Sequence, residues 1–153
     1  MIRLTKLTDY GIVLMSHLAA EPTELMTASS LSQATQLPLP TVSKILKALS
    51  REGLLVSHRG VNGGYGLVRG PRDISVADVI AAMEGPIAMT ECSDLGECEQ
   101  ESFCMVRGNW QRINDAVRNA LNGISLEEMA HPFRVLPGEA SRNLVHLGNV
   151  TPH

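Results

Sequence analysis

All three cysteines of the chain, Cys92, Cys98 and Cys104, lie within one segment of thirteen residues. An odd number of cysteines cannot pair off within one chain. The N-terminus has no signal-peptide pattern, and no run approaches the roughly 20 apolar residues that span a membrane, so we expect a cytoplasmic protein without membrane contact. Thiols stay reduced in that compartment, and three thiols gathered in one segment therefore predict a metal site.

The spacing of these thiols, C-x5-C-x5-C, favours an iron-sulfur cluster. Six residues along a helix turn through about 600°, so the thiols converge only from a loop, which Gly96 permits. Structural zinc usually has ligands two to four residues apart with a second Cys or His pair, which this segment lacks. Clusters accept looser loops and a fourth, different ligand. We favour a 2Fe-2S cluster and leave a 4Fe-4S cluster open, with three free cysteines in an acidic loop as the alternative.

Two helices are expected near the N-terminus. The first begins after Thr8, a good N-cap residue, ends at the Glu21-Pro22 break, and has an apolar stripe of Ile12, Met15, Leu18 and Ala19. The second is capped by Thr27, has Leu31 and Ala34 facing inward, and ends near Pro38.

A third helix begins at Pro40, which suits a first helical position. Its inward stripe is Val42, Ile45, Leu46 and Leu49, and its opposite surface carries Thr41, Ser43, Lys44, Lys47 and Arg51. Such a surface can donate to phosphates and base edges in the major groove of DNA. For this helix alone, an ordinary solvated basic face explains the pattern equally well.

A hairpin follows the basic helix. Gly53 ends the helix, residues 54–56 form a strand, 62–64 (NGG) form a turn that tolerates positive φ, and 65–68 form the return strand. Arg59 lies at the tip among small residues, where a guanidinium can enter the minor groove. The order of helix, turn, basic helix and basic-tipped hairpin predicts a mainly α fold with a small β-hairpin wing, the winged helix-turn-helix.

Charge is distributed unevenly around an overall value of -3. Residues 1–72 hold eight Lys/Arg and four Asp/Glu, a net +4, whereas residues 73–153 hold five and twelve, a net -7. This asymmetry weakly supports a phosphate-binding N-terminal part.

Beyond the wing, Ser75 and Asp78 resemble a capping box that starts a helix ending at Gly85-Pro86. A long apolar stripe from about 109 to 121 predicts a dimerisation helix, with packing against the first helix as the alternative; it comprises Trp110, Ile113, Val117, Ala120 and Leu121. We expect a DNA-binding domain over 1–86, a cysteine loop over 87–108, the dimerisation helix and a short helix from Ser125 over 109–131, and a mobile tail over 132–153.

Residues 3–6 (RLTK), 59–67 (RGVNGGYGL) and 74–80 (ISVADVI), together with the three cysteines, resemble the bacterial IscR/NsrR-type cluster-binding repressors over roughly residues 1–130. Overall similarity is greatest to regulators of the SUF iron-sulfur assembly operon. The resemblance implies a homodimer on double-stranded operator DNA, with Cys92, Cys98 and Cys104 as cluster ligands. The candidate DNA contacts are Thr41, Ser43, Lys44, Lys47, Arg51, Arg59, Gly60 and Tyr65.

The fourth ligand departs from the IscR-like pattern. Where that pattern has a His three residues after the last cysteine, this chain has Arg107, which cannot ligate a metal. Asp9 matches the acidic residue that the nitric-oxide-sensing branch contributes from the partner subunit, although a favourable interaction with its own helix N-terminus explains Asp9 equally well. Glu97, Glu99 and Glu101 are further candidates.

The function expected from these features is repression of suf-type genes in response to cluster status. A nitric-oxide-sensing repressor of the same fold and a small iron-sulfur electron carrier are the alternatives. No nucleophile with a base and no phosphate-binding loop is found, so we expect neither an enzyme nor a small-molecule substrate.

Overall fold

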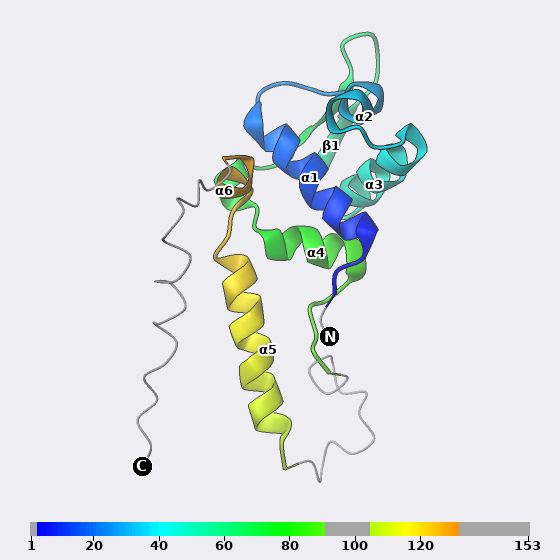
Figure 1. Cartoon of the computed structure of the whole chain (residues 1–153). Helices are drawn as coiled ribbons and strands as arrows, with labels where there is room; N and C mark the ends of the chain where they lie inside the picture. The colour runs from blue at the N-terminus through cyan, green and yellow to red at the C-terminus, as the bar shows by residue number, and fades with distance from the viewer. Residues whose placement is uncertain (1–2, 91–104, 132–153) are drawn as a thin grey trace, which may run out of the picture.

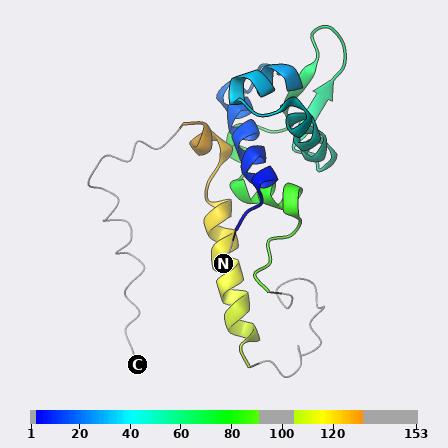
Figure 2. The ribbon, with the colours of Figure 1, turned by 45° about the vertical axis from the view of Figure 1, so that its right-hand side comes forward.

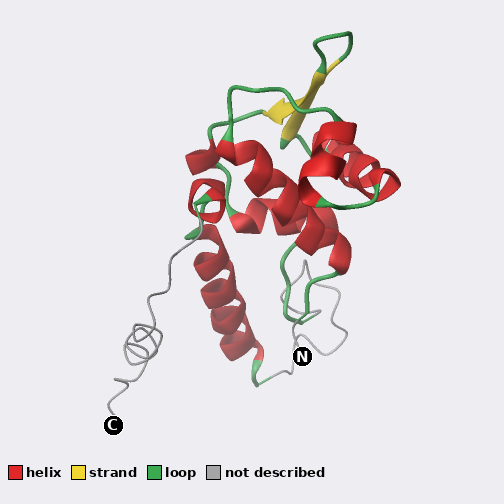
Figure 3. Cartoon of the chain, turned by 45° about the horizontal axis from the view of Figure 1, so that its top comes forward, coloured by secondary structure: helices red, strands yellow, loops and turns green. Residues whose placement is uncertain are grey.

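The computed structural model describes residues 3–90 and 105–131. Its elements, labelled in Figure 1, are α1 (Lys6–Ala20), α2 (Ala28–Thr35), α3 (Leu39–Arg51), β1 (Leu55–His58), β2 (Gly64–Leu67), the 3-10 helix η1 (Pro71–Asp73), α4 (Val76–Glu84), α5 (Arg107–Asn122) and α6 (Leu126–Ala130). This mainly helical architecture with one antiparallel hairpin confirms the predicted fold class (Figure 3).

The core is built around α1, which packs against α3, α4 and α6. Leu14 and Met15 of α1 are completely buried, as is the whole predicted stripe of α3, namely Val42, Ile45, Leu46 and Leu49. Each such side chain contributes about 2 kcal/mol by leaving water. The buried stripe orients the opposite, basic surface of α3 toward solvent.

The N-terminus of α1 differs from the prediction. The helix begins at Lys6 with Thr5 as N-cap, whose Oγ1 accepts from the Thr8 N–H at 3.2 Å. Thr8 is instead buried, and its hydroxyl donates to Glu84 Oε1 at 2.5 Å, while the Thr5 N–H donates to the same oxygen at 2.8 Å. Both threonines suit a cap, and the choice between them depends on Glu84, which lies far away in sequence.

The Glu84 carboxylate links the end of α4 to the start of α1, and the Thr8 hydroxyl and the Thr5 N–H lower its pKa. A lowered pKa stabilises the fold above the unfolded-state value of roughly 4.3 and loses that contribution as pH falls through the folded-state value. We therefore expect Glu84→Gln to flatten the loss of stability below about pH 4.5. Urea denaturation between pH 3 and pH 7 measures this, with the exposed Glu21→Gln as the unchanged control; equal acid slopes for both variants would contradict it.

Two details of α2 and α3 also differ from expectation. Ala34 is exposed, because α2 is only two turns long and contacts the core through the buried Leu31 and the partly buried Ala28. The helix α3 begins at Leu39, which places Pro40 at its second position, where the missing N–H still costs no intrahelical bond.

The wing strands pair with Leu55 opposite Leu67 and His58 opposite Gly64. Compared with the predicted ranges, β1 starts one residue later and ends two residues later, and β2 starts and ends one residue earlier. Leu54 is excluded from the strand because its N–H bonds Leu49 O in the turn that ends α3. At the tip, Gly60 has a φ of +114°, and a Cβ on Gly63 would collide with the His58 carbonyl oxygen. The compact tip therefore depends on glycine at these two positions.

After the wing, α4 starts with the predicted Ser75–Asp78 capping box and ends at Gly85. Figures 1 and 2 show α5 extending away from the other helices, whereas α6 returns to them. There α6 packs against α1 and η1, with Leu126 completely buried. Within the described residues, no helix has the length and apolar character needed to cross a membrane.

Candidate nucleic-acid interface and metal-binding segment

The basic surface of α3 is available to a polyanion. Lys44 and Lys47 are exposed, and within residues 3–90 and 105–131 neither forms an ion pair. Arg51 is also exposed and lies 3.6 Å from Glu52, a contact that leaves its side chain 76% accessible. Thr41 and Ser43 are half-buried on the same helix. Phosphates can therefore reach these cations without displacing a buried partner.

The wing carries a second cationic group. Arg59 and Gly60 are exposed at the tip, which projects beyond the helices in Figure 3, and no described residue forms an ion pair with Arg59. Val61 beside them is fully exposed, a feature that the sequence analysis did not single out. An apolar side chain at such a tip suits contact with sugar or base edges. The sequence feature that could have identified Val61 is an apolar residue within an otherwise polar and glycine-rich turn.

Tyr65 has a different environment from the other candidate DNA contacts. It is half-buried against the core, and its backbone exchanges two hydrogen bonds with Met26, at 2.8 and 3.0 Å. These bonds tie the base of the wing to the residues just before α2. Tyr65 is thus positioned to hold the wing against the helix-turn-helix, and its contact with DNA stays a prediction.

Basic residues nearer α4 are neutralised within the protein. Arg69 lies 3.7 Å from Asp78, and the Arg72 Nε donates to Glu127 at 2.6 Å. The Glu127 carboxylate correspondingly raises the pKa of Arg72. The cations left unpaired among the described residues of the winged helix are thus concentrated on α3 and at the wing tip, together with Arg3 and Lys6 at the N-terminus.

The predicted cluster ligands Cys92, Cys98 and Cys104 lie outside the described residues, as do Glu97, Glu99 and Glu101. Arg107, where the IscR-like pattern has a His, is half-buried in the first turn of α5. Within the described part of the chain, no three His, Cys, Asp or Glu side chains gather as a metal site.

Asp9 lies in the first turn of α1 with an exposed side chain. It borders a groove of about 370 Å³ between α1 and α6, which also includes Val13, His17 and Met129. No hydrogen bond or ion pair of the Asp9 side chain is found among the described residues. The carboxylate is therefore available to bind a group from outside its own subunit. Its place in the first turn also fits a favourable interaction with the helix N-terminus.

The segment leading to the cysteines is attached to α5. The Met89 N–H donates to Asn114 Oδ1 at 3.1 Å, and Asn114 is the one described residue of α5 that is buried, with 4% exposed. A buried Asn in an exposed helix was not anticipated from the sequence. It holds residue 89 against α5, so the chain enters the cysteine segment and leaves it beside the same helix.

The predicted dimerisation stripe on α5 is largely open to solvent. Trp110 and Ile113 are 36% and 44% exposed, whereas Val117 and Leu121 are half-buried. The helix packs against α4. Large apolar side chains exposed along one helix face are typical of a surface that another chain covers.

Comparisons with known proteins agree with this architecture. The Rrf2 family, described as iron-dependent transcriptional regulators, matches residues 4–132. The chain is 33% identical to protein aau3 of Rhizobium meliloti, covering 94% of this chain and 85% of that protein. It is 29% identical to the HTH-type transcriptional regulator IscR of Escherichia coli, with coverages of 88% and 84%. The solved structure of CymR, the global cysteine regulator of B. subtilis, superposes with a TM-score of 0.70 at 31% identity, covering 86% of this chain and 98% of that one.

Proposed function

Since the chain belongs to the Rrf2 family and is an IscR-like transcriptional regulator, we propose that it is a homodimeric repressor of suf-type iron-sulfur assembly genes, controlled by a bound cluster. Family membership makes it a DNA-binding regulator and not an enzyme, and it rules out the electron-carrier alternative. As such a regulator it acts in the cytoplasm, where the operator lies.

The observation that supports DNA binding most strongly is the exposed basic surface of α3 beside the wing, on which Lys44 and Lys47 form no ion pair with any described residue. In the proposed complex, α3 enters the major groove, with Lys44, Lys47 and Arg51 toward phosphates and Thr41 and Ser43 toward base edges. The wing brings Arg59 to the minor groove, where the glycines of its tip allow close approach. Two copies joined through α5 would read two half-sites.

Three thiolates and one carboxylate form a donor set that suits an iron-sulfur cluster with one labile position. We assign Cys92, Cys98 and Cys104 to the cluster and Asp9 of the partner subunit to the fourth position. The unpartnered, exposed side chain of Asp9 supports this assignment. When bound, the cluster supplies a group whose loss or reaction reports iron and oxidant status.

The proposal is tested by the visible absorption spectrum and the iron and sulfide content of anaerobically purified protein. Wild type should be brown, Cys98→Ala should be colourless because one of three thiolates is lost, and Asp9→Ala should lose its cluster several times faster to a chelator. Glu24→Ala, which removes an exposed carboxylate between α1 and α2, is the matched control. Wild-type protein that stays colourless and iron-free after reconstitution would refute cluster sensing and leave a DNA-binding regulator with another signal.

A nitric-oxide-sensing repressor is the second candidate, and Asp9 is the feature that favours it. Nitric oxide should then abolish operator binding at low stoichiometry while suf-type genes do not respond to iron supply. Electrophoretic mobility shifts with and without nitric oxide, beside transcript levels in iron-limited cells, separate the two functions.

A further inference from the structure

The turn between α5 and α6 is joined to the segment that leaves the wing. The Val76 N–H donates to Ile124 O and the Leu126 N–H donates to Ile74 O, both at 2.9 Å, so Ser75 and Ser125 form an antiparallel bridge. The Ser75 hydroxyl also reaches Asn122 Oδ1, at 3.4 Å. Two segments about 50 positions apart in the sequence are therefore held in a fixed register.

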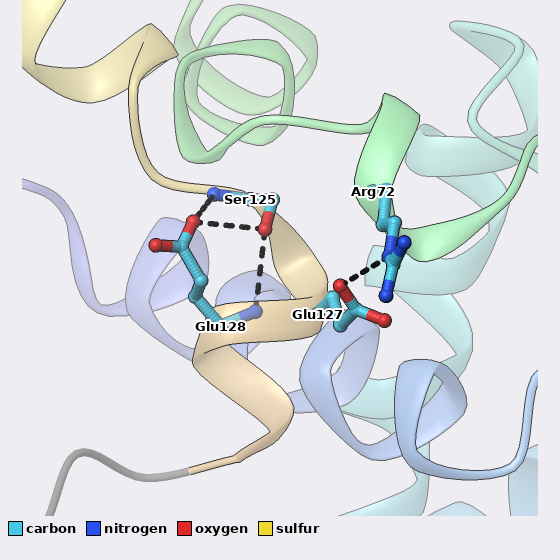
Figure 4. A network of polar contacts seen from close by, with 4 residues as sticks. All are labelled: Arg72, Ser125, Glu127 and Glu128. Carbon is cyan, nitrogen blue, oxygen red and sulfur yellow. Dashed lines mark hydrogen bonds and ion pairs between the residues drawn. The ribbon is translucent and has the colours of Figure 1, made fainter.

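Polar contacts flank this joint, and Figure 4 shows those among Arg72, Ser125, Glu127 and Glu128. Arg72 of η1 bonds Glu127 of α6 at 2.6 Å. The Ser125 N–H donates to Glu128 Oε2 at 2.8 Å, and this capping box fixes the start of α6. Each side of the joint thus has its own rigid helix start, Ser75 for α4 and Ser125 for α6.

The inner side of the joint is close-packed. Ile74 and Leu126 are completely buried, one from each strand of the bridge. Packed interiors transmit displacement instead of absorbing it. Only residues 68–73 separate Ile74 from the end of β2, so this packed joint lies one short segment away from the base of the wing.

We propose that this joint, formed by the Ser75–Ser125 bridge and the Arg72–Glu127 pair, transmits the state of α5 to the wing and so couples the cysteine segment to operator affinity. The inference rests on the proposed cluster-sensing function and adds the path by which a change at the cysteine segment reaches the wing. Asn114, at the middle of α5, holds Met89 just before the cysteine segment, and the joint attaches the C-terminal end of α5 to the wing exit. Arg72 and Glu127 are positioning residues, because in this proposal they affect operator affinity only by setting the position of the wing.

Val76→Pro tests the joint with little disturbance elsewhere. Val76 is the first residue of α4, where proline is tolerated, and the extended Ser75 backbone, at φ -93° and ψ 162°, suits a residue before proline. Proline removes the N–H that bonds Ile124 O. Val76→Ala is the matched control, since it loses side-chain volume but keeps that N–H.

The readout is the ratio of operator affinities of cluster-loaded and cluster-free protein, measured by fluorescence anisotropy. We expect Val76→Ala to keep the wild-type ratio, and Val76→Pro to bring it toward one, with the affinity of the cluster-free form changed less than about twofold. If the wild-type ratio exceeds one and Val76→Pro keeps the same ratio, the joint does not transmit the signal, although cluster sensing itself stands. If the wild-type ratio is one, the cluster does not control operator affinity, and both proposals are wrong.

Arg72→Ala provides a second test if the proline variant does not fold. The pair is exposed, so its loss costs little stability, and we expect the ratio to fall by about two- to threefold. Arg69→Ala is its control, because Arg69 lies on the same segment but pairs with Asp78 of α4. An equal loss of affinity in both cluster states would instead make Arg72 a phosphate contact and overturn its role in coupling.

Discussion

In the proposed homodimer, replacing Ile113 with glutamate should separate the subunits and lower operator affinity by about 100-fold or more. Ile113 and Trp110 are the exposed large apolar residues of the α5 stripe, and a dimer interface on this face would remove both from water. An unpaired carboxylate in such an interface costs several kcal/mol, on the order of 3 to 5. A monomer also loses the second half-site, which carries much of the affinity of a two-fold dimer.

Sedimentation velocity and operator titration on the same samples measure this prediction. Asn119→Glu is the matched control, because it adds the same charge to an exposed position of α5 on another face of the helix. Asn119 lies about 120° around the helix axis from Ile113. We expect the control to remain dimeric with unchanged affinity. An Ile113→Glu variant that sediments as a dimer would show that another surface joins the subunits.

The double substitution Lys44→Ala/Lys47→Ala should weaken operator binding by about 10- to 100-fold without changing the fold. Both side chains are exposed on α3, opposite its buried stripe, and neither forms an ion pair among the described residues. Each phosphate contact that is lost reduces the salt dependence of binding, so the slope of log K against log salt should decrease by roughly 0.9 for each lysine in each subunit.

Titrations at several salt concentrations, on operator and on unrelated DNA, measure both effects. Loss of phosphate contacts should weaken the two DNAs alike, whereas loss of base contacts would weaken the operator more. Arg118→Ala removes an exposed cation from α5, at a distance from α3 and the wing, and serves as the control. An unchanged salt slope in the double variant would mean that the basic surface of α3 does not face DNA.

The winged helix could be predicted from the sequence because its signals are local. The apolar period of residues 42–49 is completely buried as expected, and the caps at Thr27 and Ser75 start the predicted helices. Helix boundaries were less accurate where two equivalent residues compete. Thr5 and Thr8 both suit an N-cap, and the carboxylate of Glu84 decides between them.

The candidate site likewise has features that local sequence predicts and features that depend on tertiary contacts. The basic surface of α3 and the glycine-rich wing tip follow from residue type and spacing, and the structure exposes both. The roles assigned to the cysteines, Asp9 and the DNA contacts stay predictions. Tyr65 resembles an exposed wing residue in sequence, yet its ring packs partly against the core because the base of the wing pairs with Met26.

The order of elements, the basic surface of α3 and the clustering of the thiols can be read from the sequence, because they depend on residues that are close together along the chain. Three contacts become evident only in the folded chain: α6 returns to α1, Asn114 is buried against Met89, and Ser75 pairs with Ser125. These contacts join residues 25 to more than 100 positions apart. Their formation depends on which apolar surfaces compete best for burial, and that competition involves the whole chain.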